Sequence, residues 1–145
     1  MNYTFNFVEF TAVYSDATGT YISPTSLISF DETETNIGNG MDPSTGIFTV
    51  PISGTYSFSL SGLLDPVMIQ TSDQNPLWRV YQTDESEAEL STLDFFNQND
   101  SMMTGQEPFN YTWEMSLDQG DEIYLKCPTY IILFEARFSG QLVMI

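Results

Sequence analysis

Apolar and polar residues alternate with a period of two along most of the chain, and no long stretch repeats with the period of a helix. The segment 54–61 alternates strictly, with Tyr56, Phe58 and Leu60 on one face and serines on the other. Segments 109–117 and 134–144 alternate in the same way. Successive side chains of a strand point to opposite faces of a sheet, so this pattern is typical of half-buried strands. The alternation predicts an all-β fold.

The segment 5–14 differs because it carries apolar residues on both parities. One parity holds Phe5, Phe7 and Val13, and the other holds Val8, Phe10, Ala12 and Tyr14. A strand buried on both faces has this composition. We expect one face to pack into the core and the other to be covered by a neighbouring subunit. Under the alternative, Phe5 and Phe7 only fray or cover an edge of the core.

Turn signals separate the predicted strands at intervals of roughly ten residues, which favours a β-sandwich or jelly roll. They include the segments 16–19, 36–40, 42–46 and 118–121. The length of 145 residues suits one domain, which we place over residues 1–145. The acidic run 84–89 is expected to be an exposed loop or strand edge.

The composition excludes several classes of function. The chain has 3 Lys+Arg, 20 Asp+Glu and no His, which gives a formal net charge of −17. Three cations cannot neutralise a phosphate backbone or attract anionic lipid, so we expect no nucleic-acid partner. Without histidine there is no Ser-His-Asp triad and no His-ligated zinc. No apolar run approaches the roughly 18 residues of a membrane span, so no membrane insertion is expected.

The single cysteine, Cys127, excludes an intrachain disulfide and a metal site built from several cysteines. It shares its strand parity with Ile123 and Leu125, so we interpret it as a small core residue and not as a nucleophile. Paired carboxylates are abundant, but the sequence favours no pair as a catalytic site. We therefore predict that the protein is not an enzyme. The N-terminus has no cationic segment followed by an apolar run, so no signal peptide is expected in this chain.

Four motifs occur in one order along nearly the whole chain. They are the spaced set Phe30, Asn36, Met41, Phe48, Gly54, Tyr56, Phe58 and Leu60; the step Thr45-Gly46-Ile-Phe48-Thr-Val-Pro51; the hairpin Leu117-Asp-Gln-Gly120-Asp121-Glu-Ile123-Tyr-Leu125; and the ending Phe138-Ser-Gly140-Gln-Leu142. Together they resemble the signature of the C1q-domain family. The family has an aromatic residue or Leu in place of Met41 and an aromatic residue in place of Leu60, and both departures keep a bulky apolar side chain.

The resemblance implies a ten-stranded jelly-roll β-sandwich of C1q/TNF-like type that assembles as a compact homotrimer. It also implies a non-enzymatic recognition domain, extracellular or surface-exposed, with a lectin-like or pattern-recognition role. The ligand would be an extracellular protein or a carbohydrate. One alternative is a structural trimerisation or fibre-tip capping module on a surface appendage, spore or virion. A third reading is a TNF-like ligand, but the Gly-x-Tyr-x-Phe spacing favours the C1q branch.

The resemblance also suggests a calcium site. Some C1q-like trimers bind calcium near their axis through acidic residues of the loop before the strand that leads to Gly-Asp. In this chain that loop contains Asp100 and Glu107, and three copies would form a ring of six carboxylates. Calcium takes six to eight oxygen ligands, and bound cations would offset the repulsion within a trimer of formal charge 3 × (−17) = −51. Under the alternative, the loop is simply solvated.

Overall fold

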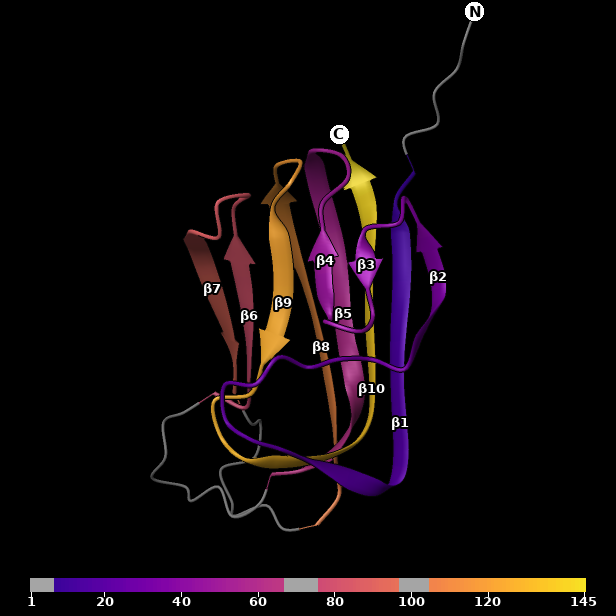
Figure 1. Ribbon diagram of the computed structural model, residues 1–145, viewed down its shortest axis with the longest axis vertical. Helices are drawn as coiled ribbons and strands as arrows, with labels where there is room; N and C mark the ends of the chain where they lie inside the picture. Colours follow the sequence, from indigo (N-terminus) through magenta and orange to yellow (C-terminus); the bar gives the residue numbers. More distant parts are fainter. Residues whose placement is uncertain (1–6, 67–75, 97–104) are drawn as a thin grey trace, which may run out of the picture.

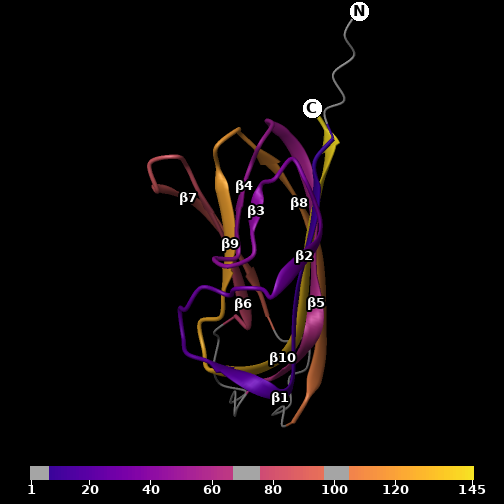
Figure 2. The same ribbon diagram turned by 45° about the vertical axis from the view of Figure 1, so that its right-hand side comes forward.

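The computed structural model describes residues 7–66, 76–96 and 105–145. These residues form ten strands and no helix. The strands are β1 (Glu9–Ile22), β2 (Glu32–Ile37), β3 (Met41–Asp42), β4 (Ile47–Thr49), β5 (Gly54–Asp65), β6 (Trp78–Thr83), β7 (Glu89–Phe95), β8 (Glu107–Leu117), β9 (Glu122–Lys126) and β10 (Ile131–Met144). They make two antiparallel sheets of five strands, in the orders β2-β1-β10-β5-β8 and β3-β4-β9-β6-β7. Figures 1 and 2 show the two sheets face to face. The predicted all-β jelly roll is confirmed.

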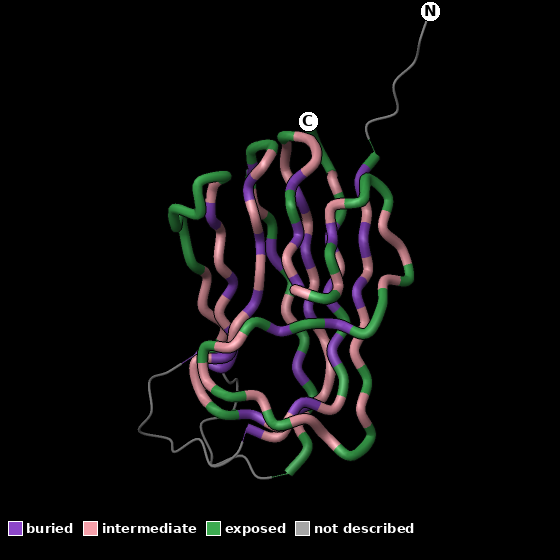
Figure 3. The backbone as a smooth tube through the Cα atoms, in the orientation of Figure 1, coloured by how far each residue is buried: buried purple, intermediate pink, exposed green. Residues whose placement is uncertain are grey.

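The period-two alternation places aromatic rings between the sheets. Along β5 the exposed fractions of Tyr56, Phe58 and Leu60 are 0%, 1% and 0%, while the serines between them face outward. Figure 3 shows this alternation of buried and partly exposed residues along the strands. Phe48 of the second sheet meets rings of the first sheet in the core, with its ring centroid 4.5 Å from that of Phe10 and 6.1 Å from that of Phe58. Ring-to-ring packing therefore holds the two layers together.

The strand β1 contains an irregularity where the sequence predicted a turn. The segment 16–19 lies inside β1, whose register against β10 shifts between Ser15 and Thr20. Gly19 adopts a φ of +86°, and the Asp16 carboxylate accepts hydrogen bonds from the Thr18 backbone N–H and hydroxyl. The predicted turn was wrong. Because β10 keeps pairing beyond the shift, these turn-forming residues make a bulge and do not reverse the chain.

The start of β1 tests the prediction that one face of segment 5–14 packs into the core. Val8, Phe10 and Ala12 are buried, as their shared parity requires, and Val13 on the other parity is half-buried. Phe7 precedes the strand and is 49% exposed in the isolated chain. Phe5 lies outside the described residues. Coverage of this side by a neighbouring subunit therefore stays a prediction.

Several motif residues serve the architecture. The Asn36 side chain donates to the Met41 carbonyl at 2.8 Å and accepts from the Met41 N–H at 3.2 Å, which closes the turn between β2 and β3. The buried Asp121 carboxylate accepts from the Asp118 N–H and the Gln82 amide, each at 3.0 Å, and so fixes the hairpin before β9. The beginning of β1 and the end of β10 lie at the same end of the sandwich (Figure 1). Among the described residues no helix has the length and hydrophobicity that a membrane crossing needs.

Candidate binding surfaces

The outer face of the first sheet carries small hydroxyl side chains. We call it the serine face, and it comprises Ser57, Ser59 and Ser61 of β5 with Thr11 of β1, Thr112 of β8 and Ser139 of β10. Ser59 lies between Ser139 and Thr112 in the strand register, and the hydroxyls of Thr11 and Ser139 are 3.2 Å apart. The chain has 20 acidic residues, yet no outward position of β5 from 55 to 63 is charged. The central strand of this face therefore presents a strip of mostly small, uncharged side chains.

The serine face is not flat along its whole length. An open hollow of about 440 Å³ lies where β10 bulges between Leu133 and Glu135, and its lining includes Val13, Asn110 and Arg137. The Arg137 guanidinium donates to the Glu34 carboxylate on β2 at the rim of the face. A smaller hollow of about 140 Å³ continues between Ser57, Ser59, Thr112 and Ser139. The face thus offers recesses into which side chains of another chain could insert.

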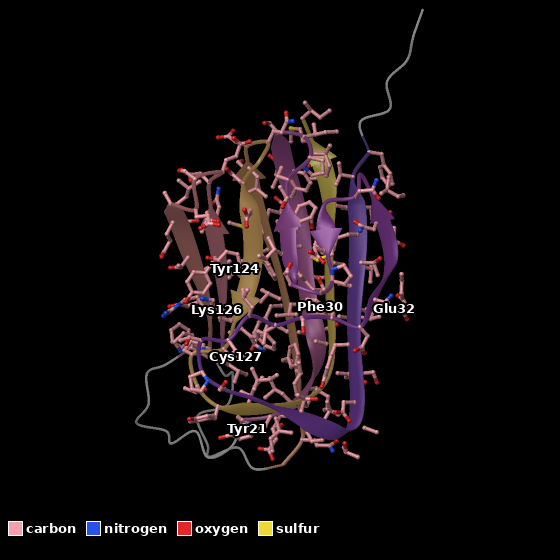
Figure 4. All side chains as sticks on the ribbon, viewed as in Figure 1. Tyr21, Phe30, Glu32, Tyr124, Lys126 and Cys127 are labelled. Carbon is pink, nitrogen blue, oxygen red and sulfur yellow. The ribbon has the colours of Figure 1, made fainter. Side chains whose placement is uncertain are left out.

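The outer face of the second sheet carries a different set of side chains. We call one region the tyrosine hollow, an open cavity of about 260 Å³ lined by Leu27, Ile47, Thr83, Glu87, Glu122, Tyr124 and Lys126. The Tyr124 ring stacks on that of Tyr81, with centroids 5.2 Å apart and an interplanar angle of 6°. The Lys126 ammonium lies 5.2 Å from the Tyr81 centroid and 5.7 Å from the Tyr124 centroid. Figure 4 shows Tyr124 and Lys126 following one another along β9.

The electrostatics of this face keep Tyr124 protonated. Burial raises the pKa of the Tyr124 hydroxyl, and the neighbouring Tyr81 and the carboxylates of Glu89, Glu122 and Glu87 raise it further. The hydroxyl is therefore a hydrogen-bond donor at neutral pH. One aromatic ring, two aliphatic side chains, two carboxylates and an ammonium line one small cavity, and such a mixture of apolar and polar groups suits a small polar ligand.

A third surface lies at the end of the sandwich opposite the C-terminus, where Figure 4 labels Tyr21. The rings of Tyr21 and Tyr130 stack with centroids 5.2 Å apart, although the residues are 59% and 48% exposed.

The predicted calcium ligands belong to the segments around β8. Glu107 is the first residue of β8, opposite Leu64, whereas Asp100 lies outside the described residues. Within the described segments, no three residues of the types His, Cys, Asp and Glu are grouped closely enough to hold a metal ion. The calcium site stays a prediction.

The remaining reactive groups are structural. Cys127 is fully buried, and burial raises the pKa of its thiol, so the reactive thiolate is not available at neutral pH. The Arg79 guanidinium donates to both carboxylate oxygens of Asp94, at 2.6 and 3.2 Å, which ties β6 to the edge strand β7. The prediction that Cys127 is a core residue is confirmed.

A family model described as "C1q domain" matches residues 9–143. The chain belongs to the C1q-domain family. The globular domain of zebrafish complement 1qA is similar in structure, with a TM-score of 0.63, 17% identity and coverage of 94% of this chain and 97% of that one. Eiger TNF from S. frugiperda gives a TM-score of 0.64 at 10% identity and covers 94% and 92%, and murine APRIL gives 0.61 at 12% and covers 95% and 100%. At these identities the structural likeness shows the shared C1q/TNF fold.

The family membership confirms the resemblance read from the motifs. C1q and TNF-like domains are in general ligand-binding modules without enzymatic activity, and they usually act outside the cell. Sequence reasoning did not find the tyrosine hollow. Its signal was present, because Tyr124 and Lys126 share the outward parity of one strand and Tyr81 lies on another. Only the pairing of β9 with β6, however, places Tyr81 opposite Tyr124.

Proposed function

We propose that this C1q-family domain is a homotrimeric recognition module whose subunits meet through the serine face. The observation that carries the proposal is the uncharged strip of β5 on a chain of formal charge −17. Interface cores are depleted in charged residues, and like charges placed opposite each other weaken association. The small side chains of the strip also let another chain approach closely. The charged side chains of this face lie on the flanking strands, with Glu114 of β8 opposite Ser57 and Arg137 of β10 opposite Ser61.

The ligand would be an extracellular protein or a carbohydrate, and the protein would act in an extracellular or surface-exposed setting. A threefold assembly presents three copies of each binding surface on a rigid β scaffold. Three weak sites that engage one surface together raise the avidity without any new contact. Lectin-like or pattern recognition is the role that suits such an arrangement. A purely structural trimer would assemble equally well but would bind no ligand.

The experiment is a measurement of mass in solution by light scattering. A trimer would give three times the chain mass of 16.4 kDa. Ser59→Arg places a long cation at the centre of the strip and is expected to yield a folded monomer. The matched control is Thr92→Arg on the exposed outer side of β7, which should stay trimeric. A wild-type monomer, or a Ser59→Arg protein that remains trimeric, would refute assembly through this face.

Calcium binding by Asp100 and Glu107 is a second part of the proposal. A carboxylate ring would bind calcium most tightly when the subunits are assembled, so the ion would stabilise the trimer. The melting temperature is then expected to rise with calcium and to fall with a chelator. Asp100→Ala and Glu107→Ala should abolish this dependence, while Glu89→Ala on the exposed edge strand β7 of the other sheet should keep it. If neither calcium nor a chelator changes the melting temperature of the wild-type protein, the proposed calcium site is refuted.

A further inference from the structure

The tyrosine hollow has an apolar wall. Ile47 on β4 lies beside Tyr124, since its neighbour Phe48 pairs with Ile123, and Leu27 forms an isolated bridge with Lys126. Tyr124 lines the hollow and Tyr81 does not. One face of the Tyr124 ring is stacked on Tyr81 of β6, and Ile47 of β4 lies on the opposite side of β9. Together, Leu27, Ile47 and Tyr124 form a surface that suits the C–H face of a ring.

The two ends of the hollow carry opposite charges. Glu122 and Lys126 lie four residues apart on β9, which is about 13 Å along a strand. Glu87, in the turn between β6 and β7, adds a second carboxylate to the lining. Glu87 has a φ of +65°, a backbone conformation that non-glycine residues seldom adopt. Two acceptors therefore lie on one side of Tyr124 along the strand and a cationic donor on the other.

The Lys126 ammonium has no carboxylate partner within the part of the chain that the structure describes. The other two cations of the chain form ion pairs, Arg79 with Asp94 and Arg137 with Glu34. No ion pair of Lys126 within 4.0 Å occurs among the described residues, although the same face holds Glu87 and Glu122. Its ammonium rests instead near the two tyrosine rings. Lys126 thus retains protons to donate to a ligand.

We propose that the tyrosine hollow binds one neutral monosaccharide ring, such as the terminal residue of a glycan. The C–H face of the sugar packs against Tyr124 and the two aliphatic side chains. The sugar hydroxyls donate to Glu122 and Glu87 and accept from Lys126. This inference rests on the proposed recognition function and names its ligand class and its site.

The size and the charges of the tyrosine hollow favour a neutral monosaccharide as its ligand. A volume of about 260 Å³ is below the roughly 300–1,000 Å³ of pockets for drug-sized ligands, so the hollow suits a single ring. Two carboxylates and a chain charge of −17 disfavour an anion, and Lys126 disfavours a simple cation. The hydroxyls of a neutral polyol both donate and accept hydrogen bonds, so they can pair with the carboxylates at one end of the hollow and with the ammonium at the other. For a ligand of about a dozen heavy atoms, a Kd of about 1 mM per site is expected.

The experiment uses Lys126 as a unique reporter, because it is the only lysine in the chain. In protein labelled with ¹⁵N at lysine alone, the amide spectrum contains one signal, at the hollow itself. Galactose, glucose, mannose and N-acetylglucosamine are each titrated to about 50 mM, well above the expected Kd. Glycine betaine and N-acetylneuraminic acid serve as the zwitterionic and anionic probes. A saturable shift with at least one neutral sugar, and none with the other two probes, supports the proposal.

Matched variants locate the binding. Glu122→Gln keeps the shape but loses the charged acceptor, so the affinity should fall about tenfold or more. Tyr124→Leu removes the ring and should abolish the saturable shift. Glu114→Gln makes the same chemical change on the outer side of β8 and should bind as wild type. Equal weakening by Glu114→Gln and Glu122→Gln would overturn the assignment of this site.

Light scattering on the same samples separates the two proposals. A folded trimer in which none of the four sugars shifts the Lys126 signal, or in which only betaine or neuraminic acid does, overturns the sugar site and leaves the assembly standing. A monomer whose Lys126 signal shifts with a neutral sugar, and whose shift is lost in Tyr124→Leu, supports the site and refutes the trimer. Thermal melting of each variant shows whether it is folded, and Glu122→Gln is a nearly isosteric change.

Discussion

Truncation of Phe58 to alanine is the sharpest test of how the two sheets are held together. The Phe58 ring is 1% exposed and packs against aromatic rings from both sheets, with centroids 5.4 Å from Trp113 and 6.1 Å from Phe48. A buried phenylalanine removes roughly 150–250 Å² from water, which at about 25 cal/mol per Å² is about 4–6 kcal/mol. Measured Phe→Ala losses in cores are about 3–5 kcal/mol. We expect the free energy of unfolding to fall by about 4 kcal/mol.

The assay is urea unfolding followed by circular dichroism at one fixed chain concentration, because assembly makes apparent stability concentration-dependent. With a slope of about 2 kcal/mol per molar urea, the midpoint should fall by about 2 M. For a chain of this length, thermal melting should shift downward by about 15 °C. Tyr21→Ala is the matched control, since Tyr21 is 59% exposed, and it should cost less than about 1 kcal/mol. Similar losses for the two variants would refute the packing argument.

Three further predictions address a turn, the thiol and a close contact in the core. Hydrogen bonds from Ser86 lower the pKa of the Asp84 carboxyl, so the stabilising contribution of this carboxylate is present at neutral pH and is lost as the pH falls through the lowered pKa. The wild-type protein should therefore be less stable to urea at pH 3 than at pH 6. In Asp84→Asn this difference in stability should shrink. The Cys127 thiol is buried with a raised pKa, so it should react with an aromatic disulfide reagent only after urea unfolding; rapid reaction of the native protein would contradict this. A Cβ at Gly140 would lie 2.5 Å from a ring carbon of Phe10, so Gly140→Ala should cost about 1–3 kcal/mol by overpacking, and a neutral effect on melting would show that the ring can move aside.

Strand identity and core residues could be read from the sequence because both depend on local alternation. The parity of Tyr56, Phe58 and Leu60 alone assigns their inward face, and the burial of Cys127 follows from the same rule along β9. The family could be recognised for a related reason. Its motifs consist of the glycines, aromatics and turn residues that the architecture needs at those positions.

The expected turn at 16–19 shows where local reasoning ends. Asp16 and Gly19 have the chemistry of a turn, yet β1 continues through them as a bulge because β10 pairs with the chain on both sides of that point. Local sequence states which backbone conformations are permitted. The partner strand decides whether the chain reverses or only bends.

The sequence by itself determined the class of fold, the parity of the core and the strong negative charge, since each of these is a property of neighbouring residues or of composition. Only the tertiary structure decided which outward side chains meet. Tyr81 and Tyr124 are 43 positions apart, and strand pairing sets their rings 5.2 Å from each other. Ser59 and Ser139 become neighbours across β5 and β10 in the same way. Binding surfaces depend on such long-range register, which no local period encodes.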